Sequence, residues 1–447
     1  MKKTKILVIM SLVLSLLVGA IPNVGTSVEA ASNIPDVKVA FINVCDEKAS
    51  EKEAGKADAT VIEANNEMVL VDCGEKRTFE HLRARLIARY KKMVGSKQNE
   101  KVVLKEIVIT HNHSDHMGAL ASILADTENF EVKKVCYANI CEQCTKSSEN
   151  CTCKGPEKTN LQKIENAIAK RKGLKIKKMK ALPEASKRDK DDLEPYEIDL
   201  GDTRVEVYRP ISKSDYIRIH KLETKNYEDG CKTDDQKAKA KEKHYTLWAN
   251  NRSMIVRVVK TKEVDGPNNK KQRIAIKDGM TALLLGDLYI NGIYSAKNVY
   301  GDKIFNKEYE VCKVGHHGFR SSGFWGQSGD DMKKWRVEYS SSQAFWKDFD
   351  ENNRKTLVNA EIAFYNSNIC AKSYVFNVTD DKVQNTSEGT VKRYNKLAAK
   401  EKLKYIDEKG QKVASTCTKY GSVFRVDSSN ELHIHGTVCK EIKNSTK

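Results

Sequence analysis

Apolar and polar positions alternate with two different periods along the first third of the chain. Short β-rich runs at Val37–Val44 and Glu67–Asp72 predict two opening strands. From Phe79, apolar side chains recur every three or four residues, which predicts one face of a helix. A buried strand is expected over Val102–Thr110, and the pattern of Leu120–Leu124 predicts a helix soon after it.

The same alternation continues to the end of the chain. A helix is expected from about Asn160 to near Gly173, a loop and helix over Trp325–Trp346, and a last helix over Val391–Ala398. The remaining predicted strands are Leu174–Lys178, Thr203–Tyr208, Met254–Val259, Thr281–Leu285, Ala360–Tyr365, Ser422–Val426 and Glu431–His435. Strand clusters punctuated by helices predict an α/β domain of two mixed sheets, packed face to face with helices outside.

This domain is expected to span residues 36–440 and to carry two insertions. The first, at about 139–156, is rich in Cys, and the second, at about 213–247, is rich in Lys and is expected to be an exposed excursion. Strands resume after the second insertion and need the earlier sheet to pack on. We therefore expect one domain and not two.

The N-terminus resembles an export signal. Three lysines precede an apolar run over Ile6–Ile21, and Val28-Glu29-Ala30 offers a small-residue cleavage pattern. A retained membrane anchor is the alternative, but the run is short for a spanning helix. We predict a signal peptide over residues 1–30 and a secreted, extracellular protein with no transmembrane segment after its removal.

The charge balance favours anionic partners. Lys and Arg exceed Asp and Glu by 78 − 61 = 17, and removing residues 1–30, with three Lys and one Glu, leaves +15. Such an excess attracts nucleic acid or anionic envelope polymers. A lysine-covered surface that only confers solubility remains an equal alternative, because the lysines are spread along the chain. The oligomeric state is left open.

Four of the twelve cysteines, Cys141, Cys144, Cys151 and Cys153, cluster in the first insertion. Two interpretations stay open for them: a loop pinned by disulfides, or a small zinc knuckle. Export favours disulfides. No catalytic role is assigned to these residues.

The segment Thr110–Gly118 carries the strongest chemical signal. It reads Thr-His-Asn-His-Ser-Asp-His-Met-Gly and so places His111, His113, Asp115 and His116 within six positions. Imidazoles and a carboxylate suit Zn, Mn or Fe. Because the segment lies between a strand and a helix, residues two positions apart can face one ion while the next residue turns toward a second.

Two weaker elements support this site. Thr281–Asp287 is an apolar strand that ends in Gly-Asp, which places a carboxylate at a sheet edge where it can bridge two cations. Val311–Gly318 is another strand that ends in a histidine pair, His316 and His317. Each element alone is more often structural, and the order of all three along the chain is what predicts a site.

Together these residues resemble the metallo-β-lactamase superfamily, whose fold is an αββα sandwich with a metal cleft at one edge of the sheets. More narrowly, the chain resembles the branch that includes the hydrolase domain of the DNA-uptake competence protein and the cell-wall phosphorylcholine esterase. The matching segments are Val69–Gly74, His111–His116, Asn250–Val256, Leu285–Asp287 and Lys313–Gly318. The likeness spans most of the chain after Val37.

The resemblance implies a ligand set. His111 and His113 would bind one metal ion, Asp115 and His116 a second, and Asp287 would bridge them. His316 or His317 would complete the second site, with His316 preferred, and Asp72 would orient a ligand histidine. A third imidazole for the first ion has no counterpart, since the chain there reads Val135-Cys-Tyr-Ala-Asn139. Cys73 is expected to pair with Cys45 across the first hairpin.

A secreted metal-dependent hydrolase is therefore predicted, with one or two Zn²⁺ ions or with Mn²⁺ or Fe in their place. A divalent ion lowers the pKa of bound water from about 15.7 toward about 7 and makes metal-bound hydroxide available. Asp115 and His116 are the predicted catalytic residues. Arg320, Ser321 and Ser322, just after the histidine pair, are expected to contact an anionic substrate.

Three functions remain open. The first is hydrolysis of phosphodiesters in nucleic acid or the cell envelope, and the second is hydrolysis of a lactone, β-lactam or other ester on the same fold. The third is a non-catalytic binding protein with a degenerate metal site. The missing imidazole favours the third, whereas the complete set for the second ion argues against it.

Overall fold

The computed structural model describes residues 37–42, 44, 57–95, 101–142, 146–153, 158–220, 250–266, 271–318, 369–379, 415–417, 422–426 and 432–436. All of them belong to one compact unit, Asp36–Lys447. The predicted signal peptide, the predicted strand Ala360–Tyr365 and the two helices predicted after Trp325 lie outside the described residues. Among the helices of the described ranges, none has the length and apolarity needed to cross a membrane.

The first sheet has eight strands in the order β17-β16-β1-β2-β3-β5-β7-β8. Strands β3, β5, β7 and β8 run parallel to one another, and the hairpins β1-β2-β3 and β16-β17 are antiparallel. The bounds are β1 (Val37–Phe41), β2 (Thr60–Ala64), β3 (Glu67–Val71), β5 (Glu106–Ile109), β7 (Lys134–Ala138), β8 (Lys175–Met179), β16 (Ser422–Val426) and β17 (Leu432–Gly436).

The second sheet has seven strands in the order β15-β14-β13-β12-β11-β10-β9. Its β9 to β12 half is antiparallel, and β12, β13 and β14 are parallel. The bounds are β9 (Tyr196–Leu200), β10 (Thr203–Tyr208), β11 (Ile255–Asp265), β12 (Lys271–Leu284), β13 (Lys307–Lys313), β14 (Ile369–Thr379) and β15 (Ser415–Cys417). A small separate pair joins β4 (Val102–Leu104) to β6 (Phe130–Val132).

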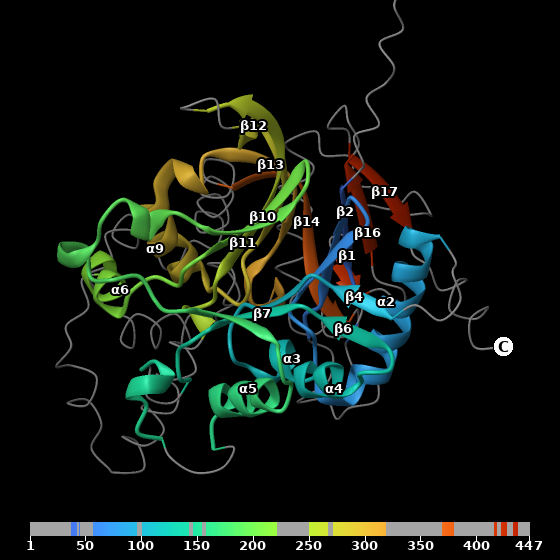
Figure 1. The fold of residues 1–447 in the computed structure, drawn as a ribbon. Helices are drawn as coiled ribbons and strands as arrows, with labels where there is room; N and C mark the ends of the chain where they lie inside the picture. Colours follow the sequence, from blue (N-terminus) through green and yellow to red (C-terminus); the bar gives the residue numbers. More distant parts are fainter. Residues whose placement is uncertain are drawn as a thin grey trace, which may run out of the picture. The chain divides into compact units, whose positions relative to one another are not determined.

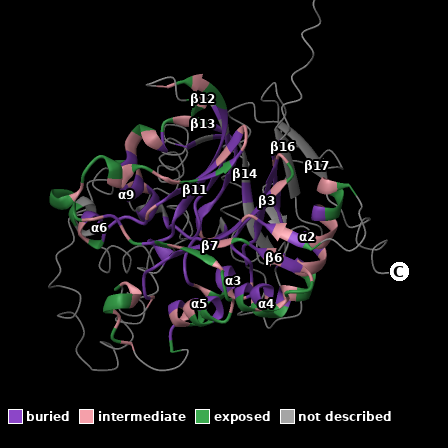
Figure 2. Ribbon diagram, viewed as in Figure 1, coloured by how far each residue is buried: buried purple, intermediate pink, exposed green. Residues whose placement is uncertain are grey.

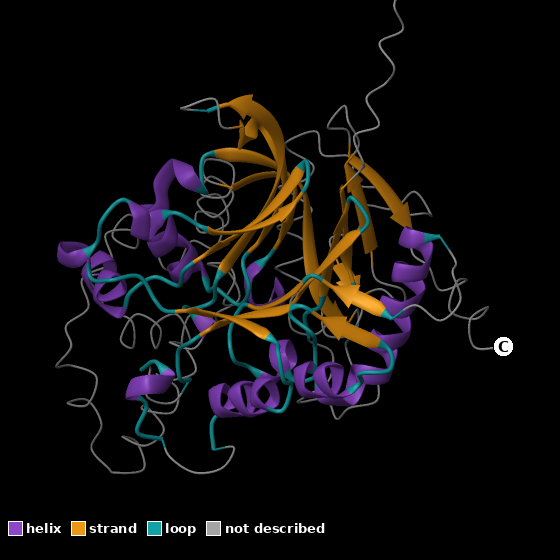
Figure 3. Cartoon of the chain, in the orientation of Figure 1, coloured by secondary structure: helices purple, strands orange, loops and turns teal. Residues whose placement is uncertain are grey.

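Helices cover the outer face of each sheet (Figures 1 and 3). The α-helices are α2 (Phe79–Val94), α3 (Ser114–Met117), α4 (Leu120–Ala125), α5 (Asn160–Ala169), α6 (Lys213–His220) and α9 (Ile290–Tyr300). Short 3-10 helices lie at Lys76–Thr78, Ser148–Asn150, Ala185–Lys187, Asp191–Leu193, Gly301–Lys303 and Gly315–Gly318. Helices α2, α4 and α5 share a core with the first sheet, and α6 and α9 share one with the second.

A third core lies between the two sheets, as the buried strands in Figure 2 show. It joins Val39, Val69 and Val108 of the first sheet to Val256 and Ala282 of the second. Because both faces of the inner strands are covered, strands such as β5 are buried at every position. The αββα sandwich predicted from the sequence is thereby confirmed.

The strand predicted over Val102–Thr110 is wrong in one respect, because it forms two strands that belong to different sheets. The break falls at Lys105, whose backbone amide donates to the Met68 carbonyl at 2.9 Å. Its ammonium reaches the Glu67 carboxylate at 2.6 Å. The charged pair Lys105-Glu106 within the apolar run is the signal that marks the break.

The Lys-rich insertion also departs from expectation at its start. Instead of an exposed excursion, its first eight residues form α6, and Asp215 and Tyr216 are buried. Asp215 accepts hydrogen bonds from Ser212 at 2.6 Å and from Arg188. Tyr216 packs into the core beneath α9. The polar composition of the insertion therefore did not reveal that its first residues form an amphipathic helix. Residues 221–249 lie outside the described residues.

Candidate metal centre

The site residues follow directly after strands that lie side by side. Strands β3 and β5 pair with Val71 opposite Val108, so Asp72 lies beside the end of β5, where the His111 loop begins. Strands β12 and β13 pair with Leu284 opposite Lys313, so the loops that carry Asp287 and the histidine pair leave the second sheet together. Carboxyl ends of neighbouring parallel strands meet at one edge, which is where α/β folds place their sites.

Backbone hydrogen bonds join these loops across the two sheets. The Met254 amide donates to the Thr110 carbonyl at 2.9 Å, and the His316 amide donates to the Gly286 carbonyl at 3.1 Å. The Asp58 amide donates to the Asp115 carbonyl at 3.0 Å. The side chains of the site are therefore held by a frame that depends on both sheets.

Four side chains form the inner group of the site: Asp58, His116, Asp287 and His317. Each offers one donor atom, these atoms lie within 4.8 Å of one another, and all four residues are buried. The Nε2 atom of His116 lies 3.1 Å from Asp287 Oδ1, and the Nε2 atom of His317 lies 3.4 Å from Asp287 Oδ2. The same His317 atom lies 3.2 Å from Asp115 Oδ2, which brings Asp115 to the edge of the inner group.

Three side chains form the outer group: His111, His113 and Asp287. Their donor atoms also lie within 4.8 Å of one another, and His113 is partly exposed. The Nε2 atom of His111 lies 3.6 Å from Asp287 Oδ2, and the two imidazole rings are 4.7 Å apart between centroids. Asp287 belongs to both groups, as expected for a carboxylate that bridges two ions.

Asp72 orients the inner group through a hydrogen bond to the ring nitrogen of His116 that faces away from Asp287. Its Oδ2 atom accepts hydrogen bonds at 2.8 Å from His116 Nδ1 and from the Thr110 hydroxyl, and its Oδ1 atom accepts from the Thr110 amide at 2.8 Å. The residue adopts a positive φ of 58°, an uncommon conformation for an aspartate. This arrangement fixes the His116 ring so that its other nitrogen points toward Asp287.

Lys313 and Asp58 form a buried ion pair under the inner group, and both are at most 3 % exposed. The Lys313 ammonium also donates to the Gly286 carbonyl at 3.0 Å, next to Asp287. A buried pair of this kind costs desolvation energy and is kept only when its geometry satisfies both charges. Here it links Asp58, two positions before β2, to the end of β13.

The loop that carries Asp287 is fixed by the segment before β11. The Asp287 amide donates to the Ser253 hydroxyl at 2.9 Å, and the Tyr289 amide donates to Asn251 Oδ1 at 3.1 Å. Gly286 has a φ of 52°, and a Cβ atom there would lie 2.6 Å from Ser253 Cβ. The glycine is therefore required both by the backbone conformation and by the close approach of Ser253.

The site holds more buried negative charge than fixed positive charge. Asp58, Asp72, Asp115 and Asp287 are each at most 6 % exposed, and Lys313 supplies one fixed positive charge against them. Burial raises the pKa of Asp58, but Lys313 and His317 outweigh burial and hold this pKa at about 2. Burial lowers the pKa of His116, but the carboxylates of Asp287 and Asp72 outweigh burial and raise it to about 10. Burial also raises the pKa of Asp287, but the neighbouring positive charges outweigh burial and lower it, so the Asp58 and Asp287 carboxylates stay ionised and draw a cation or protons to the imidazoles.

The donor atoms fit divalent metal ions. His111 Nε2 makes no hydrogen bond within the described part of the chain, and neither do His116 Nε2 and Asp287 Oδ1. Buried polar atoms normally have partners, so three that converge without any indicate a missing ligand. Nitrogen and carboxylate donors are the set that Zn²⁺ takes, and Mn²⁺ and Fe accept it as well.

Several predicted site residues come together and others are not described. His111, His113, Asp115, His116, Asp287 and Asp72 all lie in or against the two groups. Arg320, Ser321 and Ser322 lie outside the described residues. His317 belongs to the inner group, whereas His316 approaches Asp287 only to 3.9 Å. The preference for His316 as the ligand stays a prediction, and the distances favour His317.

The predicted disulfide between Cys73 and Cys45 is wrong. Cys73 is a buried free cysteine, and its thiol donates to the His116 carbonyl at 3.2 Å. Its backbone amide donates to the same carbonyl at 2.7 Å. The thiol thus braces the metal loop from the core side, which is why a small polarisable side chain suits this position.

Sequence reasoning assigned no role to three residues of the site. Lys313 and Ser253 lie within segments that carry the resemblance, and Asp58 lies outside them. Asp58 offered a faint signal, as an acidic residue two positions before a strand. Lys313 offered a stronger one, because a lysine at the end of a strand whose last positions are buried must find a partner.

Part of the chain that carries the site residues matches a known protein family. Residues 53–131, which include Asp58, Asp72 and the whole His111–His116 loop, match the sequence model described as "Metallo-beta-lactamase superfamily". Over this stretch the chain is similar to the metallo-beta-lactamase superfamily. A metal-dependent hydrolase is the activity that this superfamily and the buried His/Asp cluster support.

Solved structures of metallo-beta-lactamase proteins resemble the chain only distantly. The metallo-beta-lactamase fold protein YhfI from Bacillus subtilis has 9% identity and a TM-score of 0.28, over 62% of this chain and 70% of that one. The short form of human tRNase Z has 13% identity and a TM-score of 0.32, over 76% of this chain and 91% of that one. No curated protein matches the chain. These scores carry no conclusion about substrate.

Proposed function

We propose that this metallo-beta-lactamase-type protein is a secreted phosphodiesterase that acts on nucleic acid or on a phosphodiester polymer of the cell envelope. His111 and His113 would hold one Zn²⁺ ion, and Asp115, His116 and His317 a second, with Asp287 shared. The proposal goes beyond the superfamily, whose members share a fold and a site more than a substrate.

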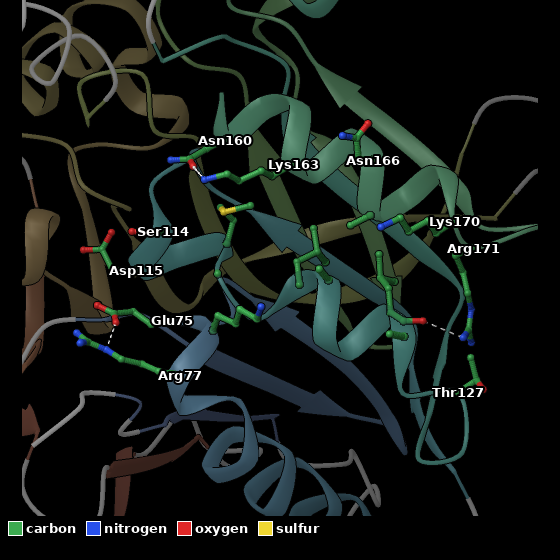
Figure 4. Close-up of a pocket in the computed structure, with 18 residues that line it drawn as sticks. Glu75, Arg77, Ser114, Asp115, Thr127, Asn160, Lys163, Asn166, Lys170 and Arg171 are labelled. Atoms are coloured by element: carbon green, nitrogen blue, oxygen red, sulfur yellow. Dashed lines mark hydrogen bonds and ion pairs between the residues drawn. The ribbon is translucent and has the colours of Figure 1, made fainter. Parts of the chain in front are cut away.

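The observation that carries the proposal is a basic groove that ends at Asp115. The groove has a volume of about 1060 Å³, and five cationic and two acidic side chains line it. Figure 4 shows Ser114 and Asp115 at one end and Lys170 and Arg171 at the other, with Lys163 between them. Asp115 also contacts His317 of the inner group, so a substrate in the groove would reach the metal centre.

The charges in the groove suit a chain of phosphates. Glu75 pairs with Arg77, and Arg171 donates to the carbonyls of Leu124 and Phe130, so both arginines are held in place. Lys163 is exposed on α5, where it donates to Asn160 Oδ1 at 3.2 Å, and Lys170 is exposed at the C-cap of the same helix. Exposed ammonium groups beside fixed guanidinium groups attract a polyanion without reading its sequence.

The catalytic roles follow from the contacts of the chain. Zn²⁺ at this site would supply a Lewis acid and a nucleophile near neutral pH. Asp72 fixes the ring orientation and tautomer of His116. Asp115, at the junction of groove and metal centre, is placed to take a proton from water that attacks the phosphorus. Lys163 and Lys170 hold the substrate by its flanking phosphates.

The decisive experiment compares a small and a large phosphodiester. The mature protein is assayed with bis(p-nitrophenyl) phosphate and with single-stranded DNA, with and without a chelator, and with a β-lactam and a lactone as comparators. We expect chelator-sensitive hydrolysis of both phosphodiesters. Turnover of the β-lactam or lactone alone would replace the proposal with the ester and amide alternative, and metal binding without any turnover would favour a binding protein.

The groove is tested by removing its lysines. Lys163→Ala/Lys170→Ala should raise KM for DNA, leave bis(p-nitrophenyl) phosphate unaffected, and reduce the salt slope of DNA binding by about 1.4 for two lost contacts to single strands. Lys187→Ala, an exposed lysine outside the groove, is the matched control. An unchanged salt slope in the double variant would remove the groove from the account.

Export is proposed from the N-terminal sequence and is tested separately. Expression of the full chain in a Gram-positive host should place the protein in the medium, with a mass that corresponds to loss of residues 1–30. Recovery of the full-length mass in the cell fraction would contradict export and would leave the proposed chemistry unaffected.

A further inference from the structure

A second group of metal-binding side chains lies outside the His/Asp cluster. The sulfur atoms of Cys141, Cys151 and Cys153 lie within 4.8 Å of one another. Cys141 is completely buried, Cys151 and Cys153 are half-buried, and all three pack against the core of the first sheet. Three thiols from a segment of thirteen positions thus meet at one point.

The geometry suits one tetrahedral ion better than disulfide pairing. Zinc binds thiolates at about 2.3 Å, which places sulfurs of a tetrahedral site about 3.8 Å apart. A disulfide joins only two sulfurs, at about 2.05 Å, and so would not use all three cysteines. Three sulfurs within 4.8 Å of one another are therefore a ready ligand set for an ion.

The segment has little regular structure. Within the described ranges its regular structure is the 3-10 helix Ser148–Asn150. Separate hydrogen bonds hold it: among others, the Cys141 amide donates to Lys146 O at 2.7 Å, the Ser148 amide donates to Asn139 Oδ1 at 3.0 Å, and the Gln162 amide group donates to Cys153 O at 2.8 Å. A cross-link among the cysteines would close this loop.

The loop also touches the His/Asp cluster. The Asn112 side chain, between His111 and His113, donates a hydrogen bond of 2.6 Å to the Ile140 carbonyl. Ile140 directly precedes Cys141. The position of the outer group thus depends on how firmly the cysteine loop is held.

We propose that Cys141, Cys151 and Cys153 bind a structural Zn²⁺ ion, distinct from the ions of the His/Asp cluster, and that this ion braces Asn112. The thiols give up their protons on binding, and zinc thiolate sites of this kind contribute directly to folding. Cys144 lies outside the described residues, and the site is defined here by the other three. The site does not depend on the phosphodiesterase activity.

Cobalt substitution tests the site, because a thiolate ligand gives Co²⁺ an intense near-ultraviolet charge-transfer band that histidine and carboxylate ligands do not give. The full mature protein is loaded with Co²⁺ in place of Zn²⁺. We expect the band in the wild-type protein and in His113→Ala, which alters only the outer group. We expect it to be lost in Cys151→Ser/Cys153→Ser, together with about one equivalent of zinc per chain. Thr152→Ala, between the two cysteines, is the matched control and should keep both.

A second measurement covers the case in which the double variant does not fold. The wild-type protein, purified without reductant, is treated with an alkylating agent before and after chelation, and the labelled cysteines are mapped by mass spectrometry. Slow labelling of Cys141, Cys151 and Cys153 that becomes fast after chelation supports the site. Recovery of these residues as disulfides, rapid labelling before chelation, or a wild-type protein without the cobalt band would overturn the proposal.

Discussion

The inner and outer groups of the metal centre share Asp287 but differ in how they are supported. The inner group is fully buried and is braced by Asp72, Lys313 and Asp115. The outer group has a partly exposed histidine, and its loop is steadied by a hydrogen bond from Asn112 to the cysteine loop. Hydrogen bonds and ion pairs that orient the ligand side chains raise the affinity of these ligands for their metal ion. We therefore expect the inner group to bind its ion more tightly.

The largest effect should follow a change in the shared carboxylate. Asp287→Ala removes a ligand from both groups, and we expect activity to fall by at least about a thousandfold, or about 4 kcal/mol of transition-state stabilisation. Metal analysis should show loss of both ions of the cluster. Asp302→Ala, an exposed aspartate after α9, is the control. Wild-type turnover in Asp287→Ala would remove the cluster from the mechanism.

Lys313→Met should reduce stability more than any change in the outer group. The variant leaves Asp58 buried without its ion-pair partner, and we expect a loss of about 3–5 kcal/mol in the free energy of unfolding of the metal-free protein, measured with urea. Lys105→Met breaks the partly exposed pair with Glu67 and should cost less than about 1 kcal/mol. Equal losses in the two variants would mean that the buried pair contributes no more than a surface one.

Asp72→Asn should weaken the inner group without removing a ligand. The amide can no longer fix His116 as a carboxylate does, and we expect metal affinity to fall about 10–100-fold. Isothermal titration should show the change in the tighter of two binding phases. A change confined to the weaker phase would reverse the assignment of the two groups.

His113→Ala should have a smaller effect on activity than Asp287→Ala. It removes the exposed ligand of the outer group, so we expect loss of one ion, retention of the other, and a decrease in activity of about tenfold, comparable with loss of one supporting contact. Loss of both ions in this variant would contradict the proposed independence of the inner group.

The comparison also explains what the sequence could reveal. Ligands that lie close together in the chain, His111 to His116, can be recognised from their spacing. Asp287 follows from a strand that ends in Gly-Asp, whereas the role of Asp72 was implied by the family resemblance. Asp58 and Lys313 are 255 positions apart and meet only because two sheets pack together. The local pattern of apolar and polar residues cannot reveal an ion pair between residues so far apart in the sequence.

The histidine pair shows a different limit. His316 and His317 both adopt positive φ, 47° and 55°, so the chain turns sharply between them and adjacent side chains face different directions. A strand or helix pattern cannot decide which of two residues in such a turn points inward. The periodicity also did not predict β2, a strand that follows an acidic, glycine-containing segment of the sequence.

The most direct test is a chelator titration of metal content and activity in the wild-type protein, with Asp287→Ala as the reference in which any remaining metal belongs to the cysteine loop. With bis(p-nitrophenyl) phosphate as substrate, we predict two phases of metal loss: a weakly held ion leaves first, and a tightly held ion leaves second, when the remaining activity disappears. Loss of both ions in one phase, or full activity after all metal has left, would contradict a centre built from one well-supported and one poorly supported group.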